Sequence, residues 1–239
     1  MLVGRVLTET GPRWVRADGD GCVTVADPFT GAVPSDVGRL VSGEPLSPVE
    51  PVVVVGIAQN GPRHPSPVQA WLKSPRTVVP SGVPVRLRRD AGTAVAEGEI
   101  CVVIARDTAG LTAENADDYV LGLTAVNDLS SPERAVVDPR NFESKSGDGY
   151  TPLGPWIDTD ADIDDVALSV DVDGAPVART GSDELPMSIR ECLAYVAGWS
   201  RLGPGDIVMT GAPHSQAPVH PGQVVRIRVA GVELVTPLV

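Results

Sequence analysis

The sequence predicts a β-rich α+β domain. Short apolar runs are frequent along the chain, and 25 glycines and 23 prolines among 239 residues supply the turns between them. Asp173-Gly174 separates two such runs, at 167–172 and 175–179, a pattern typical of a β-hairpin. Only two segments have helical features, so we expect many strands and few helices around a core to which 42% apolar residues contribute.

The first fifty residues are predicted to form a small β-rich unit. Its strand patterns lie at 2–7, 14–17 and 22–26, separated by Gly, Asp and Pro. The following segment, 42–51, contains a glycine and three prolines, which is typical of a linker. We therefore predict a small N-terminal β domain at residues 1–50, whose role the sequence leaves open, and a main domain at residues 51–239.

Apolar runs predict most strands of the main domain. They lie at 52–58, 70–73, 100–105, 121–126 and 207–210, with a closing hairpin at 223–229 and 232–235. The first of these runs, Val52–Ala58, is almost wholly apolar and is predicted to be buried along its length. Two stretches lack periodicity and are predicted to be loops, at 59–67 and 138–155.

Two segments are predicted to be helices. Ser188 and Glu191 have the spacing of a capping box, and apolar residues follow at helical spacing over 189–199. In the segment 112–121, Thr112 is a suitable N-cap residue. We expect the second helix there.

Charge and composition exclude several classes of partner. The formal net charge is −12, with 31 acidic against 19 basic residues, which argues against nucleic acid and anionic membranes because both need a basic face. No stretch of 18 apolar residues and no signal-peptide pattern is present, so we expect a cytosolic protein. The three cysteines are widely spaced, and we expect Cys101 and Cys192 to be buried free thiols.

Two glutamates, Glu97 and Glu99, precede a strongly apolar run. In a strand, residues two apart face the same way, which places these carboxylates roughly 6–7 Å apart. Their repulsion would cost about 2–3 kcal/mol at an effective dielectric near 20, before any cost of burial. A bound divalent cation would remove both costs, and carboxylate oxygens suit Mg²⁺, Mn²⁺ or Ca²⁺. The alternative is an exposed strand end with two solvated acids.

Four segments, in this order and near this spacing, resemble the fumarylacetoacetate hydrolase family over about residues 52–239. They are Glu97-Gly-Glu-Ile-Cys-Val-Val-Ile, Thr124-Ala-Val-Asn-Asp-Leu-Ser-Ser, Ser144-Lys-Ser-Gly-Asp-Gly-Tyr-Thr-Pro-Leu-Gly-Pro-Trp156 and Leu202-Gly-Pro-Gly-Asp-Ile-Val-Met-Thr-Gly-Ala-Pro213. Ser131-Pro-Glu and the segment from His220 most resemble the isomerase/decarboxylases of homoprotocatechuate breakdown, which act on 2-hydroxyhepta-2,4-diene-1,7-dioate. The resemblance implies a mixed β-roll, a metal site in its mouth and a homodimer.

The resemblance assigns a divalent metal, Mg²⁺ or Mn²⁺, to Glu97, Glu99 and Asp128. From the residues alone, Asp128 would be interpreted as the cap of a turn before Ser130-Ser131-Pro132. Together with the glutamates it completes a three-carboxylate site that leaves positions for the oxygens of a 2-oxo acid.

The same resemblance implies roles for residues of two later motifs. Lys145 corresponds to the family's active-site lysine and would stabilise developing charge or shuttle a proton, with Asp148 orienting it or contacting the site. Thr210 and Gly211 match a turn whose hydroxyl and backbone donors would meet the substrate carboxylate. Without the resemblance, Lys145 would be interpreted as a surface lysine and Gly211 as part of a turn.

The chain departs from the hydrolytic members of the family. Their His–Glu pair, which activates water, has no full counterpart here: His64 stands alone, and Pro65 after it disfavours a helical lid. His214 offers another acid/base candidate or is an exposed loop histidine. We therefore expect a metal-dependent isomerase/decarboxylase acting on a small anionic 2-oxo acid or 2-hydroxydienoate diacid in aromatic catabolism. An acylpyruvate hydrolase, an oxaloacetate decarboxylase and a catalytically inactive binder are the alternatives.

Overall fold

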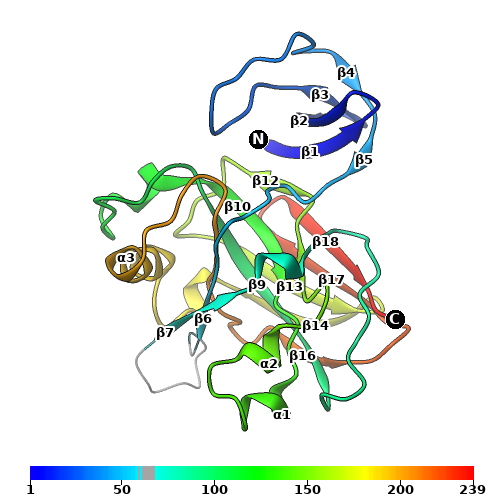
Figure 1. Ribbon diagram of the computed structural model, residues 1–239, viewed down its shortest axis with the longest axis vertical. Coiled ribbons are helices and arrows are strands. Elements are labelled where there is room, and N and C mark those ends of the chain that lie inside the picture. The colour runs from blue at the N-terminus through cyan, green and yellow to red at the C-terminus, as the bar shows by residue number, and fades with distance from the viewer. Residues whose placement is uncertain (59, 61–67) are drawn as a thin grey trace.

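The computed structural model describes residues 1–58, 60 and 68–239, and shows a molecule built mainly of strands (Figure 1). Most strands belong to one large mixed sheet, and four belong to a second, smaller sheet. The predicted β-rich α+β class is confirmed. None of the helices in the described ranges has the length and apolar composition that crossing a bilayer requires.

The N-terminal strands lie together at one end of the molecule (Figure 1). They are β1 (Leu2–Thr8), β2 (Gly11–Asp18), β3 (Gly21–Thr24), β4 (Leu40–Val41) and β5 (Glu44–Pro45). The large sheet continues from this end because β1 pairs antiparallel with β12 (Trp156–Asp158). The predicted N-terminal strands are confirmed, and the division of the chain at residue 50 stays a prediction.

The central strands of the large sheet carry the site. They are β10 (Val120–Asn127), β9 (Ala94–Ile104), β15 (Ile207–Met209), β6 (Val54–Ala58) and β7 (Gln69–Lys73), in that spatial order. β15 and β6 are parallel, whereas the other neighbours are antiparallel, which makes the sheet mixed.

The predicted strand at 52–58 is wrong at its start. Val52 is 81% exposed, and β6 begins only at Val54. The N–H groups of Val52 and Val53 donate to Oδ1 of Asp206 at 3.1 and 2.7 Å. This carboxylate takes the place of a strand partner, so apolar composition alone did not extend the strand.

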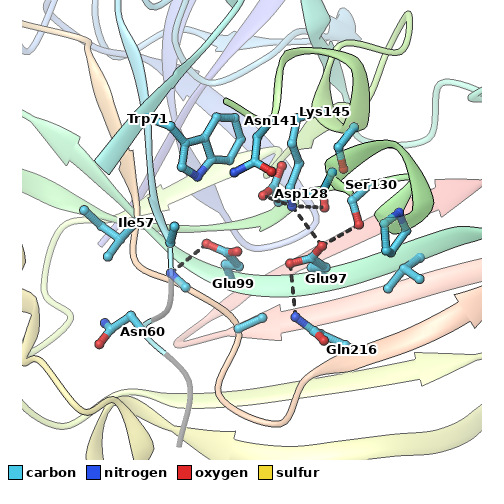
Figure 2. A pocket seen from close by; sticks show the side chains of 17 residues that line it. Ile57, Asn60, Trp71, Glu97, Glu99, Asp128, Ser130, Asn141, Lys145 and Gln216 are labelled. Carbon is cyan, nitrogen blue, oxygen red and sulfur yellow. Dashed lines mark hydrogen bonds and ion pairs between the residues drawn. The ribbon is translucent and has the colours of Figure 1, made fainter. Parts of the chain in front are cut away.

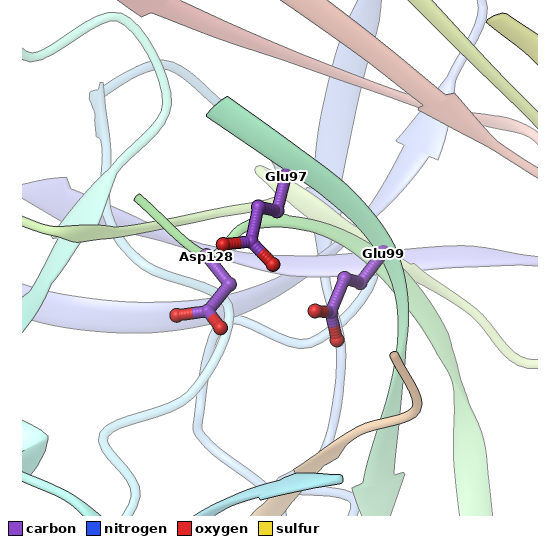
Figure 3. Close-up of side chains that lie close together, drawn as sticks. All are labelled: Glu97, Glu99 and Asp128. Carbon is purple, nitrogen blue, oxygen red and sulfur yellow. The ribbon is translucent and has the colours of Figure 1, made fainter. Parts of the chain in front are cut away.

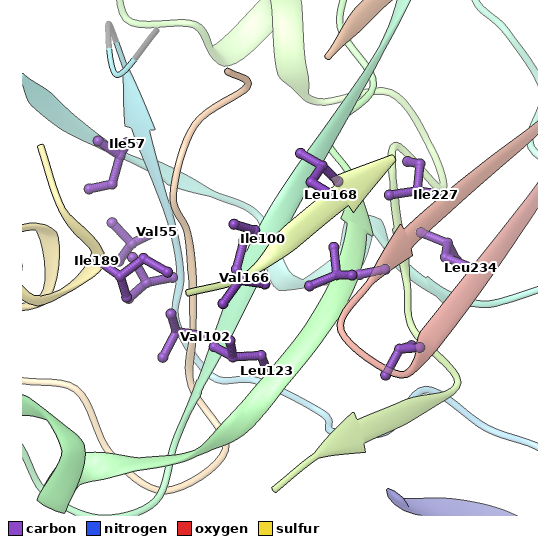
Figure 4. Packing of buried hydrophobic residues seen from close by; sticks show 14 of the residues in the cluster. Val55, Ile57, Ile100, Val102, Leu123, Val166, Leu168, Ile189, Ile227 and Leu234 are labelled. Carbon is purple, nitrogen blue, oxygen red and sulfur yellow. The ribbon is translucent and has the colours of Figure 1, made fainter. Parts of the chain in front are cut away.

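The second sheet packs against the first and closes the core. Its order is β14 (Ala175–Gly181), β13 (Ala167–Val172), β17 (Val224–Val229) and β18 (Val232–Pro237). Both predicted hairpins are confirmed, and Asp173 and Gly174 have the positive φ angles, 52° and 79°, that a tight hairpin turn needs. Ile100, Leu123 and Leu168 lie in the core between the sheets (Figure 4).

One predicted helix is confirmed and one is wrong. α3 (Ile189–Trp199) begins with the Ser188–Glu191 capping box. The segment 112–121 instead contains a short 3-10 turn, η2 (Ala116–Tyr119). Asn115 explains the difference. Its side-chain oxygen accepts a hydrogen bond from the N–H of Thr112 at 2.7 Å, and its side-chain amide donates to the carbonyl of Gly110. These two bonds stabilise a loop at the position where Thr112 was predicted to cap a helix.

The predicted long loop at 138–155 is also wrong. It contains the short helix α2 (Phe142–Lys145) and the strand β11 (Thr151–Leu153). Asp138 accepts the N–H of Glu143 at 3.0 Å and so satisfies a donor in the first turn of α2. Neither element is long enough to produce a periodic pattern in the sequence.

Several short elements complete the fold. They are η1 (Pro75–Thr77), β8 (Val78–Pro80), α1 (Pro132–Ala135), η3 (Ser182–Glu184) and β16 (Gln216–Val219). β16 pairs with the first half of β9 and so extends the sheet beside the two glutamates. The cysteines are free thiols, and Cys101 and Cys192 are buried as predicted.

Candidate metal and active site

Strand β9 positions both glutamates on one face of the large sheet. Glu97 and Glu99 alternate with Gly98, which faces the opposite way toward the second sheet. A Cβ at Gly98 would lie 2.5 Å from a methyl carbon of Val170 on β13. Glycine therefore permits the close approach of the two sheets where β9 carries its acidic pair.

Asp128 reaches the glutamates because β10 ends beside them. Asn127 at the end of β10 is paired with Gly98, and the N–H of Asp128 donates to the backbone carbonyl of Glu97 at 2.9 Å. Within the described residues, one oxygen from each of Glu97, Glu99 and Asp128 lies within 4.8 Å of the others (Figure 3). The three carboxylates converge on one point.

These carboxylates are largely removed from water. Glu99 is 3% and Asp128 is 1% exposed. Burial, together with the charges of Asp128 and Glu97, raises the pKa of Glu99 well above its ordinary value. Burial acts in the same direction on Asp128, but Lys145 and Lys73 outweigh it and hold that pKa below its ordinary value. Like charge is thus concentrated at a point where a cation would relieve it.

Lys145, at the end of α2, directs its ammonium at two of the three carboxylates (Figure 2). Its Nζ donates to Oε1 of Glu97 at 2.8 Å and to Oδ2 of Asp128 at 2.5 Å. Burial would lower the pKa of Lys145, but the charges of Asp128 and Glu97 outweigh burial and raise it. The ammonium also lies 5.5 Å from the centroid of the Trp71 ring, within cation–π range.

Two neutral side chains hold Glu97 in place. The hydroxyl of Ser130 donates to Oε1 at 2.5 Å, and the amide of Gln216 donates to Oε2 at 3.2 Å (Figure 2). The backbone N–H of Gly211 donates to Oε2 of Glu99 at 2.8 Å. Each glutamate therefore has a fixed orientation.

Lys73, at the end of β7, is a member of the cluster that the sequence analysis missed. Its side chain is completely buried, and its Nζ donates to Oδ1 of Asp128 at 2.5 Å and to the carbonyl of Tyr150 at 2.7 Å. Burial lowers its pKa, against the opposing attraction of Asp128. The sequence does contain a signal that could have drawn attention to Lys73. The chain has seventeen arginines but only two lysines, Lys73 and Lys145.

The cluster lies in a cavity of about 280 Å³. Lys145 and all three carboxylates line this cavity. Its remaining wall is partly apolar and includes Ile57, Trp71, Val95, Pro132, Ala135 and Ala212. A small molecule in the cavity would therefore contact both charged groups and apolar carbon.

The donor set fits a divalent cation of the hard class. Three carboxylate oxygens within 4.8 Å of one another are the ligands that Mg²⁺ and Mn²⁺ prefer, and no thiol or imidazole joins the cluster in the described part of the chain. The acidic triad of Glu97, Glu99 and Asp128 could hold such an ion.

Three predicted site residues make no side-chain contact with the carboxylates, namely Asp148, Thr210 and Gly211. Asp148 is exposed and does not line the cavity. The carboxylates that contact Lys145 are those of Asp128 and Glu97, where Asp148 had been predicted. The hydroxyl of Thr210 donates to the carbonyl of Ile100 at 3.0 Å, which directs it into the sheet. Gly211 does line the cavity, and its backbone N–H is engaged by Glu99.

The two candidate histidines have different outcomes. His214 is exposed, lies outside the cavity lining and has a positive φ of 59° in the turn before β16. His64 falls outside the described residues, together with most of the predicted loop at 59–67. The described part of the site thus consists of carboxylates, lysines and neutral donors.

Comparison with known proteins agrees with this architecture. The family profile described as Fumarylacetoacetate (FAA) hydrolase C-terminal matches residues 47–239. A 5-carboxymethyl-2-hydroxymuconate delta-isomerase structure from Mycobacterium smegmatis is 31% identical, covers 100% of this chain and 99% of its own, and superposes with a TM-score of 0.87. A 2-hydroxyhepta-2,4-diene-1,7-dioate isomerase structure from Mycobacterium marinum is 29% identical, with coverage of 100% and 98% and a TM-score of 0.89.

A bifunctional enzyme is among the curated relatives. The homoprotocatechuate catabolism bifunctional isomerase/decarboxylase of Escherichia coli is 23% identical over 174 residues, which cover 72% of this chain and 40% of that enzyme. The matched segment is therefore less than half of the relative. The family profile covers most of the chain, and the two solved structures align along its full length. This chain belongs to the fumarylacetoacetate hydrolase family, as its four motifs predicted.

Proposed function

We propose that this protein is a divalent-metal-dependent enzyme that isomerises or decarboxylates a 2-oxo acid or 2-hydroxydienoate diacid of aromatic catabolism. The observation that carries the proposal is the cluster of three carboxylates with the Lys145 ammonium at 2.5 and 2.8 Å from two of them, inside a cavity. The named activities of the two mycobacterial relatives support the choice of reaction class.

Glu97, Glu99 and Asp128 are the residues that would hold Mg²⁺ or Mn²⁺. When bound, the cation supplies positive charge beside the carboxylate and keto oxygens of a 2-oxo acid, which favours the enolate form. The residues around the triad keep its shape before any ligand arrives. Ser130 and Gln216 fix Glu97, and Gly211 fixes Glu99.

Lys145 is proposed as the charge-stabilising residue and as a proton donor to carbon. It lines the cavity, and its carboxylate partners favour the ammonium form. An ammonium at this position attracts negative charge that develops on a substrate oxygen and can donate its proton to carbon after loss of CO₂ or of an enol proton to solvent. Both reactions exchange only protons or CO₂ with the substrate, so neither one needs an activated water.

The cavity wall would orient the carbon skeleton. Trp71 and Ile57 present flat and branched apolar surface in the same cavity as the charged cluster (Figure 2). Apolar walls exclude water and strengthen the electrostatic action of Lys145. A conjugated dienoate, which is planar and partly apolar, suits such a wall.

Calorimetric titration with oxalate tests the proposal, because oxalate resembles the enolate of a 2-oxo acid. We expect binding with Mg²⁺ present, none with chelator, and a loss of at least tenfold in Glu97→Gln. Turnover is then measured on 2-oxo and 2-hydroxydienoate diacids, with acylpyruvate and oxaloacetate as alternative substrates. Metal-linked binding without turnover of any of them would indicate a catalytically inactive binder, and absence of metal-linked binding would refute the metal site.

A further inference from the structure

The two lysines of this chain both lie on one carboxylate. Lys73 donates to Oδ1 of Asp128, and Lys145 donates to Oδ2, each at 2.5 Å. Every other basic side chain apart from histidine is an arginine, and there are seventeen of them. Each oxygen of the Asp128 carboxylate is therefore held by its own ammonium group.

The two lysines differ in what else they can reach. The Lys73 side chain has no exposed surface, is anchored to the carbonyl of Tyr150 at 2.7 Å and does not line the cavity. The Lys145 side chain is 10% exposed and lines the cavity beside Glu97. Lys145 is therefore placed to meet a ligand, whereas Lys73 contacts the site only through Asp128.

We propose that Lys73 is a positioning residue: by occupying Oδ1 it fixes the Asp128 carboxylate so that Oδ2, the oxygen that Lys145 contacts, is the one directed toward a metal at the triad. Oδ2 lies on the side of Glu97, since Lys145 bridges these two groups. This inference rests on the proposed metal-dependent function and adds a residue to it.

The chemistry of lysine explains why an arginine would not serve here. A guanidinium is a planar fork that tends to bind both oxygens of a carboxylate at once. An ammonium is a compact donor that can occupy one oxygen and leave the other free. Lys73 contacts Oδ1 of Asp128 and leaves Oδ2 to Lys145, which lines the cavity and also contacts Glu97.

The site's charge also depends on Lys73. With all groups ionised, three carboxylates and two ammonium groups give a formal net charge of −1, which one divalent cation changes to +1. Without Lys73 the metal-loaded cluster would be neutral. Charge alone therefore predicts tighter metal binding in a variant that lacks Lys73, whereas positioning predicts weaker binding, so the sign of the effect separates the two roles.

A double-mutant cycle on Mn²⁺ affinity, followed by electron paramagnetic resonance, tests the inference. We expect Lys73→Met to weaken Mn²⁺ binding about tenfold, as loss of a ligand-orienting partner typically does. In an Asp128→Asn background the same substitution should change affinity by less than about twofold, because the group it acts through has been altered. In Ser130→Ala, which alters a partner of Glu97 alone, the full tenfold effect should persist.

Three results would overturn the inference. They are tighter or unchanged Mn²⁺ binding in Lys73→Met, an equal loss in the Asp128→Asn background, and restoration of parent affinity by Lys73→Arg. The last would show that a compact donor to a single oxygen is not required at this position. Absence of Mn²⁺ binding in the unmodified protein would instead refute the proposed function, and the next measurement tests Lys73 independently of metal.

Nuclear magnetic resonance of the unmodified protein with ¹³C-labelled lysine tests the inference should Lys73→Met fail to fold. Two lysine Cε signals are expected from the two lysines and are assigned with Lys145→Met. Without metal, Asp128→Asn should shift the Lys73 signal while Ser130→Ala leaves it in place. Oxalate added to the Mg²⁺-loaded protein should shift the Lys145 signal more than that of Lys73. A Lys73 signal that ignores Asp128→Asn, or follows oxalate as strongly as Lys145 does, would overturn the assignment.

Discussion

Glu99 is expected to destabilise the metal-free protein, so Glu99→Gln should stabilise it. Glu99 is 3% exposed, and its carboxylate lies within 4.8 Å of an oxygen of Glu97 and of Asp128. At that separation each pair of charges repels by about 3 kcal/mol or more at an effective dielectric near 20. Attraction to Lys145 and the hydrogen bond from Gly211 offset part of this. We expect a net gain of about 1–3 kcal/mol in the free energy of unfolding.

The pH dependence of this gain follows from the pKa of Glu99, which is raised in the folded protein. An acid with a raised folded-state pKa favours folding in its protonated form. Protonated Glu99 therefore contributes to the stability of the parent at low pH. This contribution is lost as the pH rises above about 4.5, the pKa of the glutamate in the unfolded chain. The stability difference between Glu99→Gln and the parent should be small near pH 4 and should increase toward neutral pH.

Thermal unfolding in chelator and in excess Mg²⁺ measures both effects. In chelator at pH 7 we expect a melting temperature roughly 2–10 °C higher for Glu99→Gln than for the parent. Mg²⁺ at one thousand times its dissociation constant would stabilise the parent by about 4.1 kcal/mol, while the variant gains little, so the order of stability reverses. Glu9→Gln, at an exposed turn, is the matched control and should change stability by less than about 0.5 kcal/mol. Lower stability of Glu99→Gln in chelator would refute the reasoning.

Three further predictions concern the fold that supports the site. Leu123→Ala, at a fully buried core position, should cost about 2–5 kcal/mol in urea unfolding, and a cost below 1 kcal/mol would contradict the packing. Ser188→Ala removes the capping box with Glu191 and should lower stability by about 1 kcal/mol, measured by thermal unfolding without a change in oxalate binding. Gly56→Ala places a Cβ against the Trp71 ring, so displacement of that wall should weaken Mg²⁺-dependent oxalate binding severalfold while metal affinity stays within twofold.

The sequence predicted the hairpins and α3 because each has a local physical signature. Asp173-Gly174 supplies the positive φ angles of a tight turn, and Ser188 with Glu191 satisfies helix donors within four residues. The helix expected at 112–121 does not form, and the helix propensities of its residues do not reveal why. Asn115 competes for the same backbone groups and stabilises a loop.

The candidate site was only partly accessible to sequence reasoning. Glu97 and Glu99 could be paired because strand alternation is local, but the approach of Asp128 depends on the register of β9 with β10. Lys73 lies 55 residues before Asp128, and nothing in its own neighbourhood indicates burial. Asp148 was expected at Lys145, yet the short helix α2 directs Lys145 toward Asp128 instead.

The charge of the cluster resolves an apparent conflict between this chain and an anionic substrate. A protein of net charge −12 repels anions at long range, and the three carboxylates, even with both lysines, remain negative by one formal charge. Only a bound divalent cation reverses that sign locally, because at a few ångströms and low dielectric its field exceeds that of the distant surface acids. In the proposed function, a metal would both balance the buried carboxylates and admit an anionic substrate, and the charges favour metal binding before substrate.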